Sequence, residues 1–303
     1  MNIYQEQLRN VYWGILNNYS TFLENAEAHF TYDLQAPEFA KLRGLYALES
    51  IAKTGTSFEK AKRLLHYFAP RLTHNSYYDN HVECNALQLL SYSLENSEHG
   101  INCLNKSKIL SECCLAIGIY ARRVFIHPFS PFDFDYHVVC EIFDEHLNKW
   151  IMLDPTTDGY FVDESGMPLS LLEIRNNFIS SNFQTYISST GRKRDLQKTR
   201  QRNEGENLYI MKNCFRLSYE QYNGFGKKKG LICLVPKNYS VCKNEKLNYR
   251  FRTENMPKEY RHLLEAQEKH LSEFGHLQEP EAYTVKSVYA SPAVSSRPNG
   301  IFH

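Results

Sequence analysis

The spacing of apolar residues changes at Gly118, and this change limits the folds open to the chain. Before it, several segments repeat apolar residues at helical spacing, namely 38–53, 57–72, 84–96 and 102–117. After it come short segments rich in β-branched and aromatic residues, namely 121–127, 136–144 and 149–154. Helices followed by an antiparallel meander predict an α+β fold.

The second half of the chain is harder to interpret. The segment 190–203 is polar and basic, which predicts an exposed loop or linker. Two later segments, 207–219 and 230–241, predict strands that return to the sheet. One helix is expected over 258–274. The tail after it is rich in Ser, Pro and Gly, so we expect it to be loose.

Composition narrows the classes of function. The 303 residues include 35 Lys and Arg against 34 Asp and Glu, so global charge predicts neither a nucleic-acid nor a membrane partner. No apolar run approaches the roughly 20 residues of a membrane helix. The first residues lack the order of a signal peptide, so the cytoplasm is the expected location. No C-x-x-C pair occurs among the eight cysteines, which predicts neither disulfides nor a metal site.

Three of the cysteines fall in the segment 102–117, and they differ in position. Cys113 and Cys114 lie deep in the expected helix, where a thiol is most often inert packing. Cys103 lies at the helix start, beside unpaired backbone N–H groups and the positive end of the helix dipole. Both features favour the thiolate, and the N–H groups can bind an oxyanion. Cys103 is therefore the candidate nucleophile.

A cysteine nucleophile needs a base, and the base needs an orienting partner. His137 begins the second expected strand and Asp154 ends the third. If these strands form a hairpin, the two side chains are neighbours in space. A chain with eight cysteines and 12 histidines offers many such triples, so spacing alone does not decide the matter.

Two blocks of sequence resemble the transglutaminase-like superfamily. Cys103 followed by "GIYAR" from Gly118 is similar to that family's "G-x-C … L-G-I-x-A-R". "HVVCE" from His137 and "WIMLDPT" from Trp150 are similar to its "H-x-W-x-E … W-x-x-x-D-P-T". Gly100 stands one residue further from the cysteine than the pattern asks, and Val139 replaces the tryptophan after the histidine.

The resemblance implies a papain-like α+β core in which the cysteine helix packs on an antiparallel sheet. It also implies that Cys103 is the nucleophile, His137 the general base and Asp154 its orienting partner, with no cofactor. The reaction would be acyl transfer on a peptide, an amide or an acyl thioester through a Cys103 thioester. Hydrolysis and amide formation both stay open, and a non-catalytic binding module for peptides or proteins is the alternative.

The expected organisation has four parts. They are an N-terminal helical layer (1–80), a transglutaminase-like catalytic core (81–190), a basic loop with returning strands (191–255) and a C-terminal helix with a loose tail (256–303).

Four residues are candidates for contact with substrate. Asn102 precedes the nucleophile, and it is also a candidate helix cap. Phe132 and Tyr136 belong to an aromatic loop before the base. Val139 would leave space beside the base. The basic residues of 192–202 could bind an acidic carrier protein that delivers the acyl group.

Overall fold

The computed structural model describes residues 3–133, 135–189, 196–226, 230–255, 264–265 and 279–292. Its helices are α1 Ile3–Asn18, α2 Glu38–Tyr46, α3 Leu48–Ala52, α4 Ser57–Phe68, η1 Ala69–Arg71, α5 Ala86–Glu95, α6 Cys103–Ala116, α7 Leu171–Ile179, α8 Leu196–Asn213, α9 Val241–Asn255 and α11 Val285–Val288. Its strands are β1 Thr31–Tyr32, β2 Ala121–His127, β3 His137–Asp144, β4 Lys149–Leu153, β5 Gly159–Val162, β6 Thr185–Ser188, β7 Arg216–Glu220, β8 Tyr222–Asn223 and β9 Leu231–Leu234.

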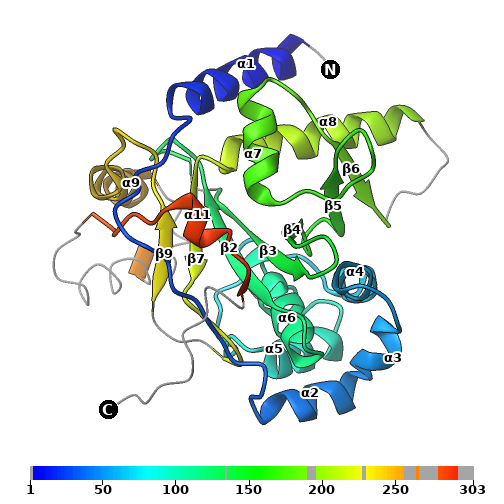
Figure 1. Ribbon diagram of the computed structural model, residues 1–303. Coiled ribbons are helices and arrows are strands. Elements are labelled where there is room, and N and C mark those ends of the chain that lie inside the picture. The colour runs from blue at the N-terminus through cyan, green and yellow to red at the C-terminus, as the bar shows by residue number, and fades with distance from the viewer. Residues whose placement is uncertain are drawn as a thin grey trace.

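A five-stranded antiparallel sheet forms the centre of the protein. Its strands lie in the order β4-β3-β2-β7-β9, so the predicted meander supplies one edge and the later strands the other. Figure 1 shows α2 to α6 on one side of the sheet and α1, α7 and α8 on the other. The predicted α+β class, with the cysteine helix packed on an antiparallel sheet, is confirmed.

Successive side chains along a strand point to opposite faces of the sheet, so the buried residues form two separate cores. On β3, Cys140 and Ile142 pack with the helices α2 to α6. Val139 directly precedes Cys140 and packs on the opposite face, with residues of α7 and β5. Both faces of β3 are thus buried, and every residue of the strand from His137 to Asp144 is buried.

The change of period at Gly118 corresponds to a sharp end of helix α6. Gly118 has a φ of 82°, a left-handed conformation that only glycine adopts at no steric cost. Its N–H donates to the carbonyl of Leu115 at 3.0 Å, which closes the helix end. The chain then enters β2 only three residues later, so the cysteine helix and the sheet are joined by a short, fixed connection.

The predicted loop at 190–203 and the predicted strand from 207 are both wrong where the structure describes them. Helix α8 covers this region to Asn213, and β7 begins only at Arg216. The short apolar run at 208–211 is compatible with either a helix or a strand. The segment forms a helix, in which Arg200 pairs with Glu204 one turn along at 3.1 Å. The helix also places Leu208 and Met211 on one buried face.

Two further predictions about the C-terminal half need correction. β9 ends at Leu234, and Pro236 separates it from α9, so 230–241 is a strand only in its first part. The expected loose tail is packed at 282–290: Ala282 forms a bridge with Cys233, and Val288 is buried. Most of the expected helix at 258–274 lies outside the described residues. The four-part division of the chain stays a prediction.

Candidate active site

Cys103 is the first residue of α6, as its position in the sequence predicts. The side-chain oxygen of Asn102 accepts a hydrogen bond from the N–H of Asn105 at 3.2 Å, which caps the helix. Cys103 is half-buried, whereas Cys113 and Cys114 are completely buried, and burial raises the pKa of both thiols well above the usual value. Of these three thiols, only Cys103 combines partial exposure with a helix N-terminus.

His137 is the first residue of β3 and is almost fully buried. Its Nε2 lies 2.8 Å from Oδ2 of Asp154. Burial alone lowers the pKa of His137. The negative charge and hydrogen bond of Asp154, together with the interaction of the imidazole with the Cys103 side chain, outweigh this and raise that pKa well above the usual value. Because Nε2 faces the carboxylate, Nδ1 is the ring atom left for the sulfur.

The strand register explains how His137 and Asp154 meet. Cys140 pairs with Leu153, the last residue of β4, across the β3–β4 hairpin. Continuing this register by one residue places Asp154 opposite Val139. Asp154 is therefore the diagonal neighbour of His137 on one face of the sheet. The second carboxylate oxygen of Asp154 accepts the N–H of Thr156 at 2.8 Å, which fixes the side chain. The charge of His137 lowers the pKa of Asp154, although burial opposes this.

Helix α8 covers the imidazole from the other side. The ring of Tyr209 lies edge-on to the ring of His137, with 5.3 Å between centroids. Its hydroxyl donates to Asp135 at 3.0 Å, and Lys212 pairs with Asp133 at 2.9 Å. These contacts hold the loop that leads into His137, because both aspartates belong to it. The packing against Tyr209 limits the orientations open to the imidazole.

Helix α9 holds the same loop from the opposite end. Asn248 donates to the carbonyl of Pro131 at 2.6 Å, and the ring of Phe132 lies 5.1 Å from that of Phe251. Tyr136 stacks on His127, with 5.7 Å between ring centroids. Phe132 and Tyr136 nevertheless remain exposed by 54% and 42%, so both rings are open to a substrate.

The structure separates the four predicted substrate residues. Phe132 and Tyr136 are accessible, and their contact with substrate stays a prediction. The amide of Asn102 is engaged at both ends, because its nitrogen donates to Oδ1 of Asn80 at 3.1 Å while its oxygen caps α6. Val139 is completely buried in the second core, so the expected space beside the base is filled.

Two charged residues near the His137–Asp154 pair were not among the candidates chosen from the sequence. Lys106 is buried on α6 within electrostatic reach of Cys103 and Asp154. Glu206 lies on α8, and burial, followed by the charge of Asp154, raises its pKa to about 7. Helical spacing from Cys103 would have placed Lys106 beside the site. Nothing local in the sequence places α8 there.

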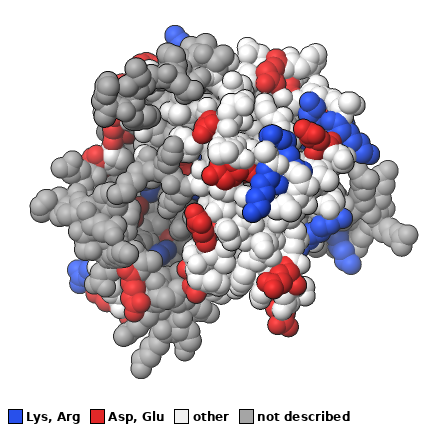
Figure 2. Space-filling model, turned by 90° about the horizontal axis from the view of Figure 1, so that it is seen from below, with Lys and Arg blue, Asp and Glu red and all other residues white. Residues whose placement is uncertain are grey.

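In the described part of the basic segment 192–202, two of the arginine side chains are already engaged by other groups of the protein. Residues 192–194 lie outside the described residues. On α8, Arg200 pairs with Glu204, and Arg202 donates to the carbonyl of Thr157 at 2.7 Å. On the face shown in Figure 2, acidic and basic side chains lie side by side rather than in a patch of one sign.

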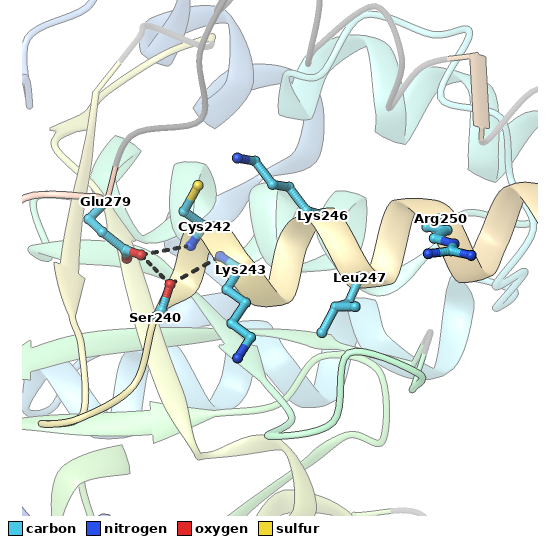
Figure 3. A pocket seen from close by; sticks show the side chains of 7 residues that line it. All are labelled: Ser240, Cys242, Lys243, Lys246, Leu247, Arg250 and Glu279. Atoms are coloured by element: carbon cyan, nitrogen blue, oxygen red, sulfur yellow. Dashed lines mark hydrogen bonds between the residues drawn. The ribbon is translucent and has the colours of Figure 1, made fainter.

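A groove of about 550 Å³ runs along α9, and its lining includes none of Cys103, His137 and Asp154. The carboxylate of Glu279 accepts the N–H of Val241 at 2.9 Å and that of Cys242 at 3.3 Å, so it occupies the helix N-terminus. Figure 3 shows Lys243, Lys246 and Arg250 extending from the helix beyond this cap. The N-terminus of α9 is therefore already occupied by the Glu279 carboxylate, so it is not open to another anion.

Residues 46–155 match the sequence model of the transglutaminase-like superfamily. The matched range contains Cys103, His137 and Asp154, and it ends before α7, so α8 and α9 lie outside it. The chain therefore contains a transglutaminase-like domain, and the resemblance seen in the sequence is confirmed. No curated protein and no solved structure matches the chain. Among the described residues, no helix has both the length and the apolar character needed to cross a membrane.

Proposed function

We propose that the protein is a cysteine-dependent acyl-transfer enzyme in which Cys103 forms a thioester with the substrate's acyl group. The observation that carries this proposal is the buried His137–Asp154 pair, 2.8 Å apart, whose imidazole interacts with the half-exposed Cys103 side chain at a helix start. A raised histidine pKa and a helix N-terminus both favour a thiolate–imidazolium pair. Structural histidines rarely combine these features.

In the proposed first step, the Cys103 sulfur attacks the acyl carbon of an amide or an acyl thioester. The N–H groups at the start of α6 bind the oxyanion that forms. The bond from carbon to the leaving nitrogen or sulfur breaks, and the imidazolium of His137 donates its proton to that leaving group. Asp154 keeps Nε2 protonated, so that Nδ1 exchanges the proton with the sulfur and the leaving group.

In the second step, water or an amine attacks the Cys103 thioester, and His137 takes the proton that the attacking group loses. Water gives a carboxylic acid, and the enzyme is then a peptidase or amidase. An amine gives a new amide, and the enzyme is then an amide synthase, for which an acidic carrier protein is one possible acyl donor. The free sulfur is restored in both cases.

The test is intact-protein mass spectrometry after exposure to a simple acyl thioester. We expect wild-type protein to gain the mass of one acyl group on Cys103, and Cys103→Ala to gain none. Cys242→Ala removes another half-buried thiol, which lies on α9, and should be acylated like wild type. Release of the acyl group in water alone supports hydrolysis, and release only by added amine supports amide synthesis. Equal acylation of Cys103→Ala and wild type would refute the proposal.

A further inference from the structure

A buried serine joins the helix that carries the candidate nucleophile to the strand that carries the candidate base. Ser107 lies one turn along α6 from Cys103, and residues four apart on a helix share one face. Its hydroxyl donates to the carbonyl of Val138, the residue directly after His137, at 2.7 Å. Ser107 and Val138 are both completely buried. The hydrogen bond therefore connects the first turn of α6 with the backbone beside the imidazole.

The strand register explains why the Val138 carbonyl takes its hydrogen bond from a side chain. Continuing the β3–β4 register by two residues past its last pair places Pro155 opposite Val138. The backbone N–H of Asp154 donates to the carbonyl of Gly159 at 2.7 Å and so is not directed at β3. Backbone groups alternate in direction along a strand, so residue 155 is the one that would offer an N–H to Val138. Proline has no backbone N–H, and the hydroxyl of Ser107 takes its place.

The other contacts of α6 with the sheet do not fix the same spacing. Farther along, α6 packs on β3 through apolar side chains, and apolar packing has no preferred direction. Arg123 donates to the carbonyl of Leu104 at 3.1 Å, but this bond joins α6 to β2. Among the described residues, the Ser107 hydroxyl makes the one hydrogen bond between α6 and β3 apart from the interaction of Cys103 with His137.

Ser111 on the same helix gives an internal comparison. It lies one turn beyond Ser107 and is also buried, but its hydroxyl donates to the carbonyl of Lys108 in its own helix, at 3.0 Å. Alanine has a higher helix propensity than serine, and it buries no hydroxyl. Both serines satisfy a hydroxyl in the core, and only Ser107 does so by joining two elements.

We infer that Ser107 is a positioning residue whose hydroxyl fixes the first turn of α6 against the start of β3 and so holds the Cys103 sulfur within reach of the His137 imidazole. This inference rests on the proposed function. Proton exchange needs the two side chains within hydrogen-bond distance, and a hydrogen bond weakens steeply as its alignment is lost. Without the Ser107 bond, the helix start is free to shift relative to the strand, and the imidazole takes the thiol proton less effectively.

The experiment compares Ser107→Ala with Ser111→Ala, which removes a buried hydroxyl from the same helix without breaking a bond to β3. The rate of Cys103 alkylation by iodoacetamide at neutral pH is measured for both variants, with urea unfolding alongside. Ser107→Ala should lower this rate by about threefold to tenfold, the effect of losing one hydrogen bond. Ser111→Ala should react at the wild-type rate. Ser107→Thr keeps the hydroxyl and should return the rate toward that of wild type.

A second measurement follows His137 itself. The interaction with the Cys103 side chain contributes to the raised pKa of His137. An NMR titration of Ser107→Ala should therefore give a His137 pKa closer to the usual value than in wild type, and Ser111→Ala should leave it in place. A merely structural serine would lower the urea midpoint in both variants and change neither the alkylation rate nor the titration.

The outcomes separate this inference from the proposal on which it rests. If Cys103 of the wild-type protein reacts no faster than Cys242, the proposed function fails and the inference fails with it. If Cys103 is reactive and Ser107→Ala keeps the wild-type alkylation rate and His137 titration, the inference alone is overturned. An equal loss of rate in Ser111→Ala would also overturn it, because that variant leaves the bond between α6 and β3 intact.

Discussion

Replacing Asp154 by asparagine should damage the imidazole's orientation more than the fold. One oxygen of Asp154 faces Nε2 of His137 at 2.8 Å, and the other accepts the N–H of Thr156 at 2.8 Å. Asparagine has only one oxygen. If that oxygen stays on the Thr156 N–H, the amide NH₂ points at Nε2, which must then lose its hydrogen. The proton moves to Nδ1, and the ring can no longer accept the thiol proton of Cys103.

The size of the effect follows from the interaction that is lost. A hydrogen bond to a charged group contributes about 1.5–3 kcal/mol. At about 1.4 kcal/mol per factor of ten, this predicts an acylation rate lower by about 10- to 150-fold. The raised pKa of His137 should also fall toward its usual value, because Asp154 is the main cause of the increase.

The assay is the rate of acyl-enzyme formation by mass spectrometry across pH, on Asp154→Asn and on a matched control. Asp163→Asn is that control, since Asp163 also accepts backbone N–H groups in a turn but has no hydrogen bond to His137 and lies at the surface. The control should acylate at the wild-type rate. An Asp154→Asn protein that is folded and acylates within about twofold of wild type would refute the reasoning.

Two further predictions concern stability. Arg122 is fully buried and lies 2.7 Å from Glu141, so Arg122→Ala should lower the free energy of unfolding by about 3–5 kcal/mol in urea denaturation, whereas Arg250→Ala, in an exposed pair, should cost less than about 1 kcal/mol. If both cost the same, burial of the Arg122 pair does not matter. The raised pKa of His137 adds stability that is fully present below about pH 6.5 and is lost as the pH rises through the folded-state pKa. His137→Gln should therefore flatten the fall of the urea midpoint between neutral and alkaline pH, and an unchanged pH dependence would contradict the assignment.

The sequence predicted the part of the fold that carries the candidate site well because its signals are local. The strands β2, β3 and β4 begin and end within one residue of their expected positions, since each is a short apolar run bounded by turn residues. The helix start at Cys103 was visible from Asn102, whose side chain does cap α6. The pairing of β3 with β4 then brings His137 and Asp154 together through register alone.

The elements that cover the site were not predictable in the same way. Helix α8 was mistaken for a loop and a strand because its charged residues hide the apolar face that packs on the sheet. Its role beside His137 depends on tertiary contacts such as the Tyr209 ring. No sequence pattern between α7 and α8 indicates that α8 packs beside His137.

The C-terminal segment shows the same limit more strongly. The carbonyl of Val288 accepts a hydrogen bond from Arg122 at 2.7 Å, and the carbonyl of Ala290 accepts one from Nε1 of Trp150 at 3.1 Å. Both donors are buried and need acceptors, which a segment more than a hundred residues away supplies. A sequence rich in small and polar residues predicts a loose tail. The segment is packed because the buried donors of Arg122 and Trp150 need its carbonyl groups as acceptors.

The most direct test of the central claim is competitive labelling of all eight cysteines with a limiting amount of iodoacetamide at neutral pH, followed by peptide mapping. The account predicts that Cys103 is alkylated first, because it combines partial exposure, a helix N-terminus and a protonated imidazole partner. Cys113 and Cys114 should stay unlabelled until the protein unfolds. Labelling of Cys242, Cys113 or Cys114 ahead of Cys103 would contradict the account.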